Sequence, residues 1–218
     1  MCGRFYVPAQ AIDGAIAFLS PELQAQARAA IAEWISDLNR PRNNVSPTQS
    51  YPVLTPNGVR PMRWGYITDK SNAVFNAKRE SMHYSLWRES LVLRRALVLV
   101  GGFYEWTGPK GERQPHAIHR ADGNAMALGA LFNDDPEAGE CFSIVTVPAS
   151  SWMQQLHHRE PLILEPAQAA TWLDLTQKPP AIKALLVPTE APLAEFACPD
   201  PRQDRPPRPG AKRDLFSE

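Results

Sequence analysis

The sequence has little cysteine and no excess of either charge. Three of its 218 residues are cysteine, at positions 2, 141 and 198, and no C-x-x-C motif occurs. This odd, widely spaced set excludes a disulfide framework and favours a reducing compartment, so we expect a cytoplasmic protein. Lys+Arg and Asp+Glu each total 23. The charge of the whole molecule therefore indicates no particular partner.

Long apolar runs and metal-ligand patterns are also missing. No segment approaches the roughly 20 apolar residues that cross a bilayer, and no secretory signal core follows Met1. His116 and His119 share one strand-like run, but no cysteine or carboxylate set completes a metal site there. We therefore expect no membrane partner, no metal and no cofactor.

The remaining pattern predicts one α+β domain. Residues 20–39 are typical of an amphipathic helix with Ser20 as N-cap and Pro21 at its first position. After residue 50, short β-branched and aromatic runs alternate with Pro, Gly, Asn and Asp. This texture predicts an α+β domain around a mainly antiparallel, barrel-like sheet over residues 1–187. Seven prolines between residues 188 and 210 predict an extended or partly disordered tail over 188–218.

Basic residues gather in the middle of the chain. Residues 40–95 contain ten Lys or Arg against three Asp or Glu. An excess of this kind favours a polyanion such as a nucleic acid. The alternative is a solvated face whose charge is balanced elsewhere in the fold.

Cys2 stands directly behind the initiator methionine. If Met1 is removed, Cys2 carries a free α-amine and a thiol on one residue, both partly deprotonated near neutral pH. Such a 1,2-aminothiol condenses with an aldehyde to an imine, and its thiol then closes a five-membered thiazolidine ring. The alternative is a cysteine without function at a loose terminus.

Three other segments contain residues suited to catalysis or anion binding. In "FNAKRES", Asn76 could orient a nucleophile, and Lys78 and Arg79 could hold phosphate oxygens, although an Asn in a turn is the alternative. In "GGFYEWTG", Glu105 lies between aromatic residues; it is either a desolvated acid/base or a carboxylate at a rim in water. In "LHHREPLIL", His157 could transfer a proton at physiological pH.

These segments, in this order, resemble the SOS response-associated peptidase family. Its members include abasic-site proteins related to the embryonic stem cell-specific 5-hydroxymethylcytosine-binding protein. The segments that carry the resemblance run from residue 1 to about 175 and are "MCGRF", "NNVSPTQ", "RWGY", "NAKRES", "LVGGFYEW", "CFSIVT" and "LHHREPLIL".

The resemblance implies a distorted β-barrel with flanking helices, a function and four catalytic residues. Cys2, freed of Met1 by autocatalysis or by an aminopeptidase, would form a thiazolidine with the aldehyde of an abasic site in single-stranded DNA. Asn76 would position the new amine, Glu105 would act as acid/base, and His157 would assist ring opening and reversal. The resemblance also allows lyase activity and a peptidase activity limited to Met1. The implied protein is a monomer, associated with the nucleoid when it binds DNA.

The resemblance also implies which residues contact DNA. Arg4 would grip a phosphate near the lesion, and Lys78 and Arg79 would hold further phosphates. The positions that would line a narrow DNA cleft are Pro47, Trp106 and Thr146. The chain departs from the family's pattern by having Lys78 where arginine is usual and by lacking tryptophans after "RWGY". Glu160 is a further departure, and we expect it to place a negative charge near the DNA.

Other functions remain open at this point. A processed N-terminal cysteine followed by glycine also begins the N-terminal-nucleophile amidohydrolases, such as glutamine amidotransferases. The basic midsection alone would suit a non-catalytic reader of modified DNA bases. Cys2, His157 and Asn76 could be drawn as the triad of a protease acting on other proteins, but no motif indicates a peptide cleft.

Overall fold

The computed structural model describes residues 3–8, 12–37, 39–40, 42–109 and 111–203. Cys2 lies outside these residues. The elements, in chain order, are β1 (Phe5–Tyr6), α1 (Asp13–Ile16), α2 (Pro21–Ser36), β2 (Ser50–Thr55), β3 (Gly58–Trp64), β4 (Tyr66–Thr68), β5 (Ser71–Val74), β6 (Asn76–Lys78), η1 (Arg79–Ser81), α3 (Ser85–Leu93), β7 (Arg95–Val100), β8 (Gly102–Thr107), β9 (Gln114–Arg120), β10 (Met126–Asp135), β11 (Gly139–Pro148), η2 (Met153–Gln155), β12 (Arg159–Pro161), β13 (Ile163–Leu164), α4 (Pro166–Leu173), α5 (Pro179–Ala184), β14 (Leu193–Ala197) and η3 (Pro201–Gln203).

Five strands close into a barrel, in the order β11–β3–β2–β7–β10 and back to β11. Most of these pairs are antiparallel, but β11 runs parallel to β3 and also to the additional strand β6. Every residue of β7 is buried, and side chains such as Leu54, Leu97 and Ile144 fill the core. The barrel with its flanking helices confirms the predicted α+β fold.

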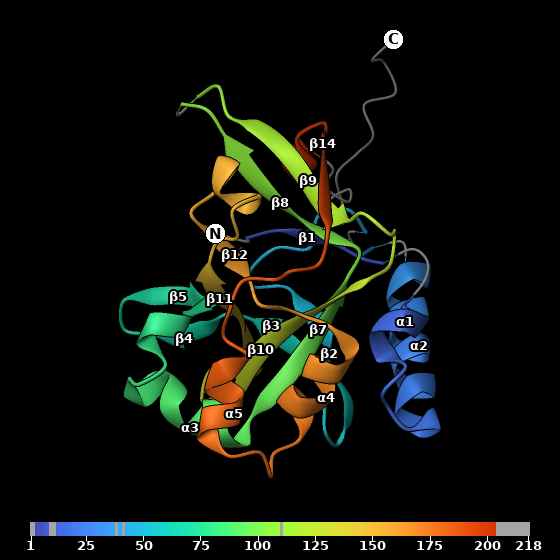
Figure 1. Ribbon diagram of the computed structural model, residues 1–218, viewed down its shortest axis with the longest axis vertical. Coiled ribbons are helices and arrows are strands. Elements are labelled where there is room, and N and C mark those ends of the chain that lie inside the picture. The colour runs from blue at the N-terminus through green and yellow to red at the C-terminus, as the bar shows by residue number, and fades with distance from the viewer. Residues whose placement is uncertain (1–2, 9–11, 38, 41, 110, 204–218) are drawn as a thin grey trace.

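Helix α2 follows the predicted N-terminal pattern. The Ser20 hydroxyl accepts a hydrogen bond from the Leu23 backbone N–H, and Pro21 opens the helix. The helix ends at Ser36, three residues before the expected end at residue 39. Trp34 packs against Tyr51 of β2 with ring centroids 4.9 Å apart. The buried side chains of α2 therefore face the barrel, and Figure 1 shows the helix along one side of it.

A second sheet, in the order β1–β8–β9–β14, stands at one end of the barrel (Figure 1). Its edge strand β14 pairs with β9 from Leu193 to Ala197. The sequence predicted a tail from residue 188 onward. The pairing of β14 with β9 shows that regular structure continues past that boundary. The sequence does not predict this strand because its side chains are mostly exposed, which leaves no alternating apolar pattern. Its stability comes from backbone hydrogen bonds to β9. Residues 204–218, the rest of the predicted tail, lie outside the described residues.

Arg95 joins two helices through its side chain. The residue is 1% exposed, and its guanidinium donates to the carbonyls of Leu91 and Val92 in α3 and of Trp172 and Asp174 at the end of α4. These helix-end carbonyls have few intrahelical donors, so the guanidinium serves as a common cap.

Arg95→Met is therefore expected to destabilise the fold by about 3–5 kcal/mol, because it leaves several carbonyls without a donor in a dry environment. Thermal unfolding should shift down by about 10 °C. The matched control is Arg94→Met, which removes an exposed pair with Glu89 and should cost under about 1 kcal/mol. Equal losses of unfolding free energy in the two variants would show that the buried guanidinium of Arg95 does not cap the ends of α3 and α4.

Candidate functional site

Glu105 lies on β8, in the second sheet. Its side chain is 4% exposed, which excludes the alternative of a rim carboxylate in water. The neighbouring Tyr104 and Trp106 belong to a separate aromatic group in which Tyr104 contacts both Tyr6 and Trp106. Burial of a carboxylate is costly without compensating contacts, so the fold must hold Glu105 in place at this position.

Strand β1 brings the N-terminal segment alongside Glu105. Phe5 pairs with Phe103, and the Tyr104 backbone N–H donates to the Arg4 carbonyl over 3.0 Å. Because the two strands are antiparallel, the residue before Arg4 in the chain continues toward Glu105. Arg4 itself donates to the side-chain oxygen of Asn44, a buried residue. The chain that carries Cys2 is therefore anchored against β8 by backbone and side-chain contacts.

The glycine pair before β8 permits this close approach. A Cβ atom added at Gly102 would lie 2.3 Å from the Ile118 carbonyl oxygen and 2.4 Å from the Tyr6 hydroxyl. Any larger residue would push β1 or β9 away from β8. The "GG" of "LVGGFYEW" is thus a packing requirement of the N-terminal strand.

Asn76, Lys78 and Arg79 come from the short strand β6 and the turn after it. Asn76 is half-buried and pairs with Ile144 of β11, whereas Lys78 and Arg79 are exposed. The Arg79 guanidinium donates to the Leu186 carbonyl over 2.9 Å. The pairing of β6 with β11 fixes the backbone of Asn76. The side chains of Lys78 and Arg79 are exposed and accessible to an anion.

His157 lies in the loop between η2 and β12. Its Nδ1 lies 3.0 Å from the Arg159 backbone nitrogen and 3.1 Å from the Arg159 carbonyl oxygen, so the backbone of Arg159 holds the imidazole in place. Burial lowers the pKa of His157, and the negative charge of Glu105 partly opposes this shift. The structure therefore brings Glu105 and His157, which are 52 positions apart, within electrostatic reach of each other.

Arg159 is a site residue that the sequence analysis did not identify. Its guanidinium donates to Glu80 Oε2 (2.8 Å), to the Thr146 carbonyl (2.6 Å) and to the Thr146 hydroxyl (3.3 Å). The side chain joins η1, β11 and β12 beside His157. The only sequence features that could have indicated this ion pair are an arginine in "HHREP" and a glutamate in "NAKRES".

Thr146 and Glu160 are both buried. Thr146 is fully buried and accepts hydrogen bonds from Arg159, so it presents no exposed surface to a ligand here, and its predicted place in the DNA cleft stays a prediction. Glu160 is 1% exposed, and its carboxylate accepts from the backbone N–H groups of Ser150 and Thr189. This carboxylate fastens two loops inside the fold, and its expected effect on DNA binding stays a prediction.

The segment after β14 covers two residues that were expected to contact DNA. The Arg202 guanidinium lies over the Trp106 ring, 5.3 Å from its centroid, and pairs with Asp200. Arg4 is close enough to Asp200 to help lower the pKa of that carboxyl, although the largest cause is the hydrogen bond from Arg202. Pro47 is half-buried in the turn before β2, where Thr48 has a φ of 77°. Trp106 and Arg4 thus share one surface, and Pro47 lies in a separate turn.

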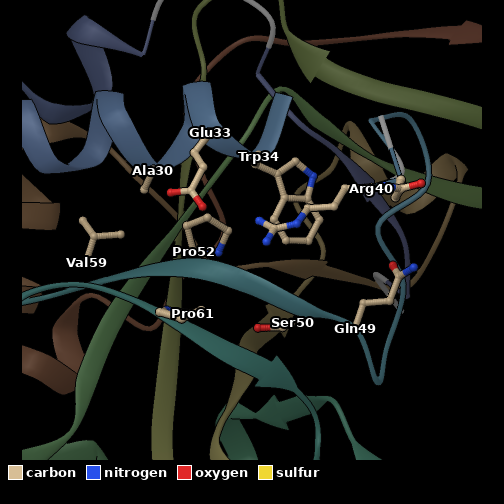
Figure 2. A pocket seen from close by; sticks show the side chains of 10 residues that line it. Ala30, Glu33, Trp34, Arg40, Gln49, Ser50, Pro52, Val59 and Pro61 are labelled. Atoms are coloured by element: carbon tan, nitrogen blue, oxygen red, sulfur yellow. The ribbon is translucent and has the colours of Figure 1, made fainter. Parts of the chain in front are cut away.

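A cavity under α2 has no residue in common with this site. It measures about 450 Å³ and lies between α2 and strands β2 and β3. Figure 2 shows Arg40 beside Trp34 at its edge, with the guanidinium 4.7 Å from the indole centroid. Among the described residues, no group of three His, Cys, Asp or Glu could share a metal ion. None of the described helices has the length and apolar character of a membrane span.

The lowered pKa of His157 predicts a pH-dependent stability. Below its ordinary pKa the unfolded chain binds a proton at this imidazole that the folded chain resists, so falling pH favours unfolding. From about pH 7.5 to about pH 5.5, the wild type should lose more stability than His157→Gln, measured by urea unfolding. His83→Gln, which removes an exposed imidazole, is the control. Parallel curves for wild type and His157→Gln would contradict this prediction.

Comparison with known proteins identifies the family. The model for the SOS response associated peptidase (SRAP) family matches residues 1–198. With this match over most of its length, the chain belongs to the SRAP family, as the sequence motifs predicted.

Three relatives have related names. The chain is 30% identical over 188 residues to "Abasic site processing protein YedK" of Escherichia coli, covering 79% of each protein. It is 27% identical over 231 residues to "Abasic site processing protein HMCES" of Mus musculus, covering 80% of this chain and 64% of the relative. An abasic site processing protein of Saccharomyces cerevisiae is 29% identical over 154 residues. The match covers 64% of this chain but only 42% of that yeast protein.

The fold recurs in solved structures. A protein from Bacteroides thetaiotaomicron superposes with a TM-score of 0.74 and covers 94% of this chain and 95% of its own, at 20% identity. This similarity establishes a shared fold and says nothing further about activity.

Proposed function

We propose that this protein caps abasic sites in single-stranded DNA covalently, through a thiazolidine made by Cys2 after removal of Met1. The observation that carries the proposal is the convergence of Glu105 and His157 beside the strand that leads to Cys2. The names of the E. coli and mouse relatives, which are called abasic site processing proteins, support a substrate of this class.

The proposed chemistry needs only groups of the protein and the lesion. The abasic deoxyribose opens to an aldehyde, and the uncharged α-amine of Cys2 adds to its carbon. A proton moves to the oxygen, water leaves and an imine forms. The thiol sulfur then adds to the imine carbon while the nitrogen takes a proton, which closes the ring. Atoms balance with the loss of one water.

Glu105 and His157 would move the protons in these steps. Glu105 is buried and His157 is half-buried, and His157 keeps an uncharged imidazole over a wider pH range because burial lowers its pKa. Asn76 would orient the amine from its fixed position on β6.

We assign DNA binding to three cations, of which Lys78 and Arg79 are exposed and Arg4 is half-buried. Arg4, Lys78 and Arg79 would hold phosphates, and Trp106 would pack against the strand once Arg202 moves from its ring. Thr146 would contribute by holding Arg159. We propose that the protein acts as a monomer and that its peptidase activity is limited to release of Met1.

The test is the intact mass of the purified protein before and after exposure to a single-stranded oligonucleotide with one abasic site. The proposal expects a chain lacking Met1, then a denaturant-stable species equal to protein plus oligonucleotide minus one water. An oligonucleotide shortened at the lesion in that species would report lyase activity. No adduct from a chain that lacks Met1 would overturn the proposal. Release of ammonia from glutamine would instead favour an amidohydrolase.

A further inference from the structure

A second cavity opens between α3, α5 and the turn that follows Lys78. It measures about 580 Å³, which is within the range of sites that bind small organic molecules or nucleotides. Its floor consists of apolar side chains, and two of those at its edge, Val92 and Val187, are each 43% exposed. An apolar hollow of this size is suited to a flat ring such as a nucleobase.

The titratable residues that line this cavity are all basic. They are Arg79, His83, Arg88 and Lys183. The two nearby glutamates are engaged elsewhere, Glu80 by Arg159 and Glu89 by Arg94. Arg88 and Lys183 pair with no acidic residue in the part of the chain that the structure describes. The mouth of the cavity therefore carries uncompensated positive charge, which suits an anion with an apolar part.

An exposed aromatic side chain stands beside the same mouth. Tyr84 is 59% exposed, and its ring lies 4.1 Å from that of His83, which lines the cavity. A large exposed ring next to a cationic groove is the arrangement with which proteins stack the bases of single-stranded nucleic acids.

The cavity continues the surface assigned to the lesion. Lys78 ends β6, and Arg79 follows it directly while donating to the Leu186 carbonyl at the cavity wall. On its other side, β6 carries Asn76. A strand whose phosphates contact Lys78 and Arg79 is therefore led toward Arg88 and Lys183.

We propose that this cavity is a second DNA subsite, which binds a nucleotide flanking the abasic site. A base would occupy the apolar hollow or stack on Tyr84, and its phosphates would lie between Arg88 and Lys183. The subsite rests on the proposed function for the identity of its ligand. It binds the DNA strand independently of the covalent chemistry.

The test measures binding of undamaged single-stranded oligonucleotides by fluorescence anisotropy, so it does not depend on crosslinking. The double variant Arg88→Gln with Lys183→Gln should bind a 15-mer about tenfold more weakly than the wild type at low salt. The slope of log affinity against log salt should fall by about 1.4. The charge-matched control, Arg28→Gln with Arg113→Gln, removes two cations outside the cavity and should change neither quantity.

Length and stacking provide independent readouts. A 4-mer, too short to reach both regions, should bind the wild type and the double variant alike. Tyr84→Ala should weaken the 15-mer at least about fivefold, since a stacked base is lost. If the double variant and Tyr84→Ala both bind the 15-mer as the wild type does, the subsite is overturned, whatever other ligand the cavity takes. Failure of the wild type to crosslink abasic DNA would refute the proposed function and leave this measurement intact.

Discussion

Alanine in place of Cys2 is expected to abolish the denaturant-stable adduct with abasic DNA. The variant keeps its α-amine, so it can still condense with the aldehyde to an imine. It lacks the sulfur that closes the ring, and an open imine hydrolyses when the protein unfolds. The loss should therefore be complete in a denaturing gel, although binding of the same oligonucleotide should persist.

Borohydride separates the two halves of this prediction. Reduction during the incubation converts an imine into a stable amine, so Cys2→Ala should regain an adduct when borohydride is present. Cys198→Ala is the matched control, because it removes a half-buried free thiol and should crosslink as the wild type does. A denaturant-stable adduct from Cys2→Ala without borohydride would refute the thiazolidine. The intact mass must show Met1 absent from every variant, since a retained Met1 would block the amine.

The parts of the fold that follow from local pattern were predictable. Ser20 and Pro21 define the start of α2 because capping depends on neighbouring residues only. The strand runs follow from β-branched residues and turn residues in the same way. The closure of β11 on both β3 and β10 depends on pairing between distant strands, which no local pattern specifies.

The candidate site shows a similar division. The four motifs identified Asn76, Glu105 and His157, but only the fold reveals that Glu105 is shielded and acts on His157. The sequence alone does not indicate whether the carboxylate of a glutamate is exposed to solvent or buried against a loop. Glu160 was therefore expected near DNA, although it accepts two backbone hydrogen bonds inside the protein. Arg159 was missed because its partners Glu80 and Thr146 come from two other elements, η1 and β11.

Glu105→Gln is expected to slow adduct formation by about 100- to 10,000-fold, the usual contribution of a positioned general acid/base. Glutamine has nearly the same shape as glutamate, so it fills the buried position on β8 without a cavity. It cannot exchange a proton with the ring oxygen or with the amine. Affinity for the abasic oligonucleotide should change little, because a buried carboxylate makes no phosphate contact.

Single-turnover kinetics with saturating protein measures this rate without the binding step. Glu112→Gln, an exposed glutamate in the turn between β8 and β9, controls for the loss of one negative charge and should react as the wild type does. The His157 imidazole supplies a second readout, since Glu105 raises its pKa against the effect of burial. In Glu105→Gln the pKa of His157, followed by NMR, should fall further below its ordinary value. If Glu105→Gln reacts slowly but leaves the pKa of His157 unchanged, Glu105 acts in the reaction without an electrostatic effect on His157. An unchanged rate would remove Glu105 from the chemistry and leave it as a buried structural residue.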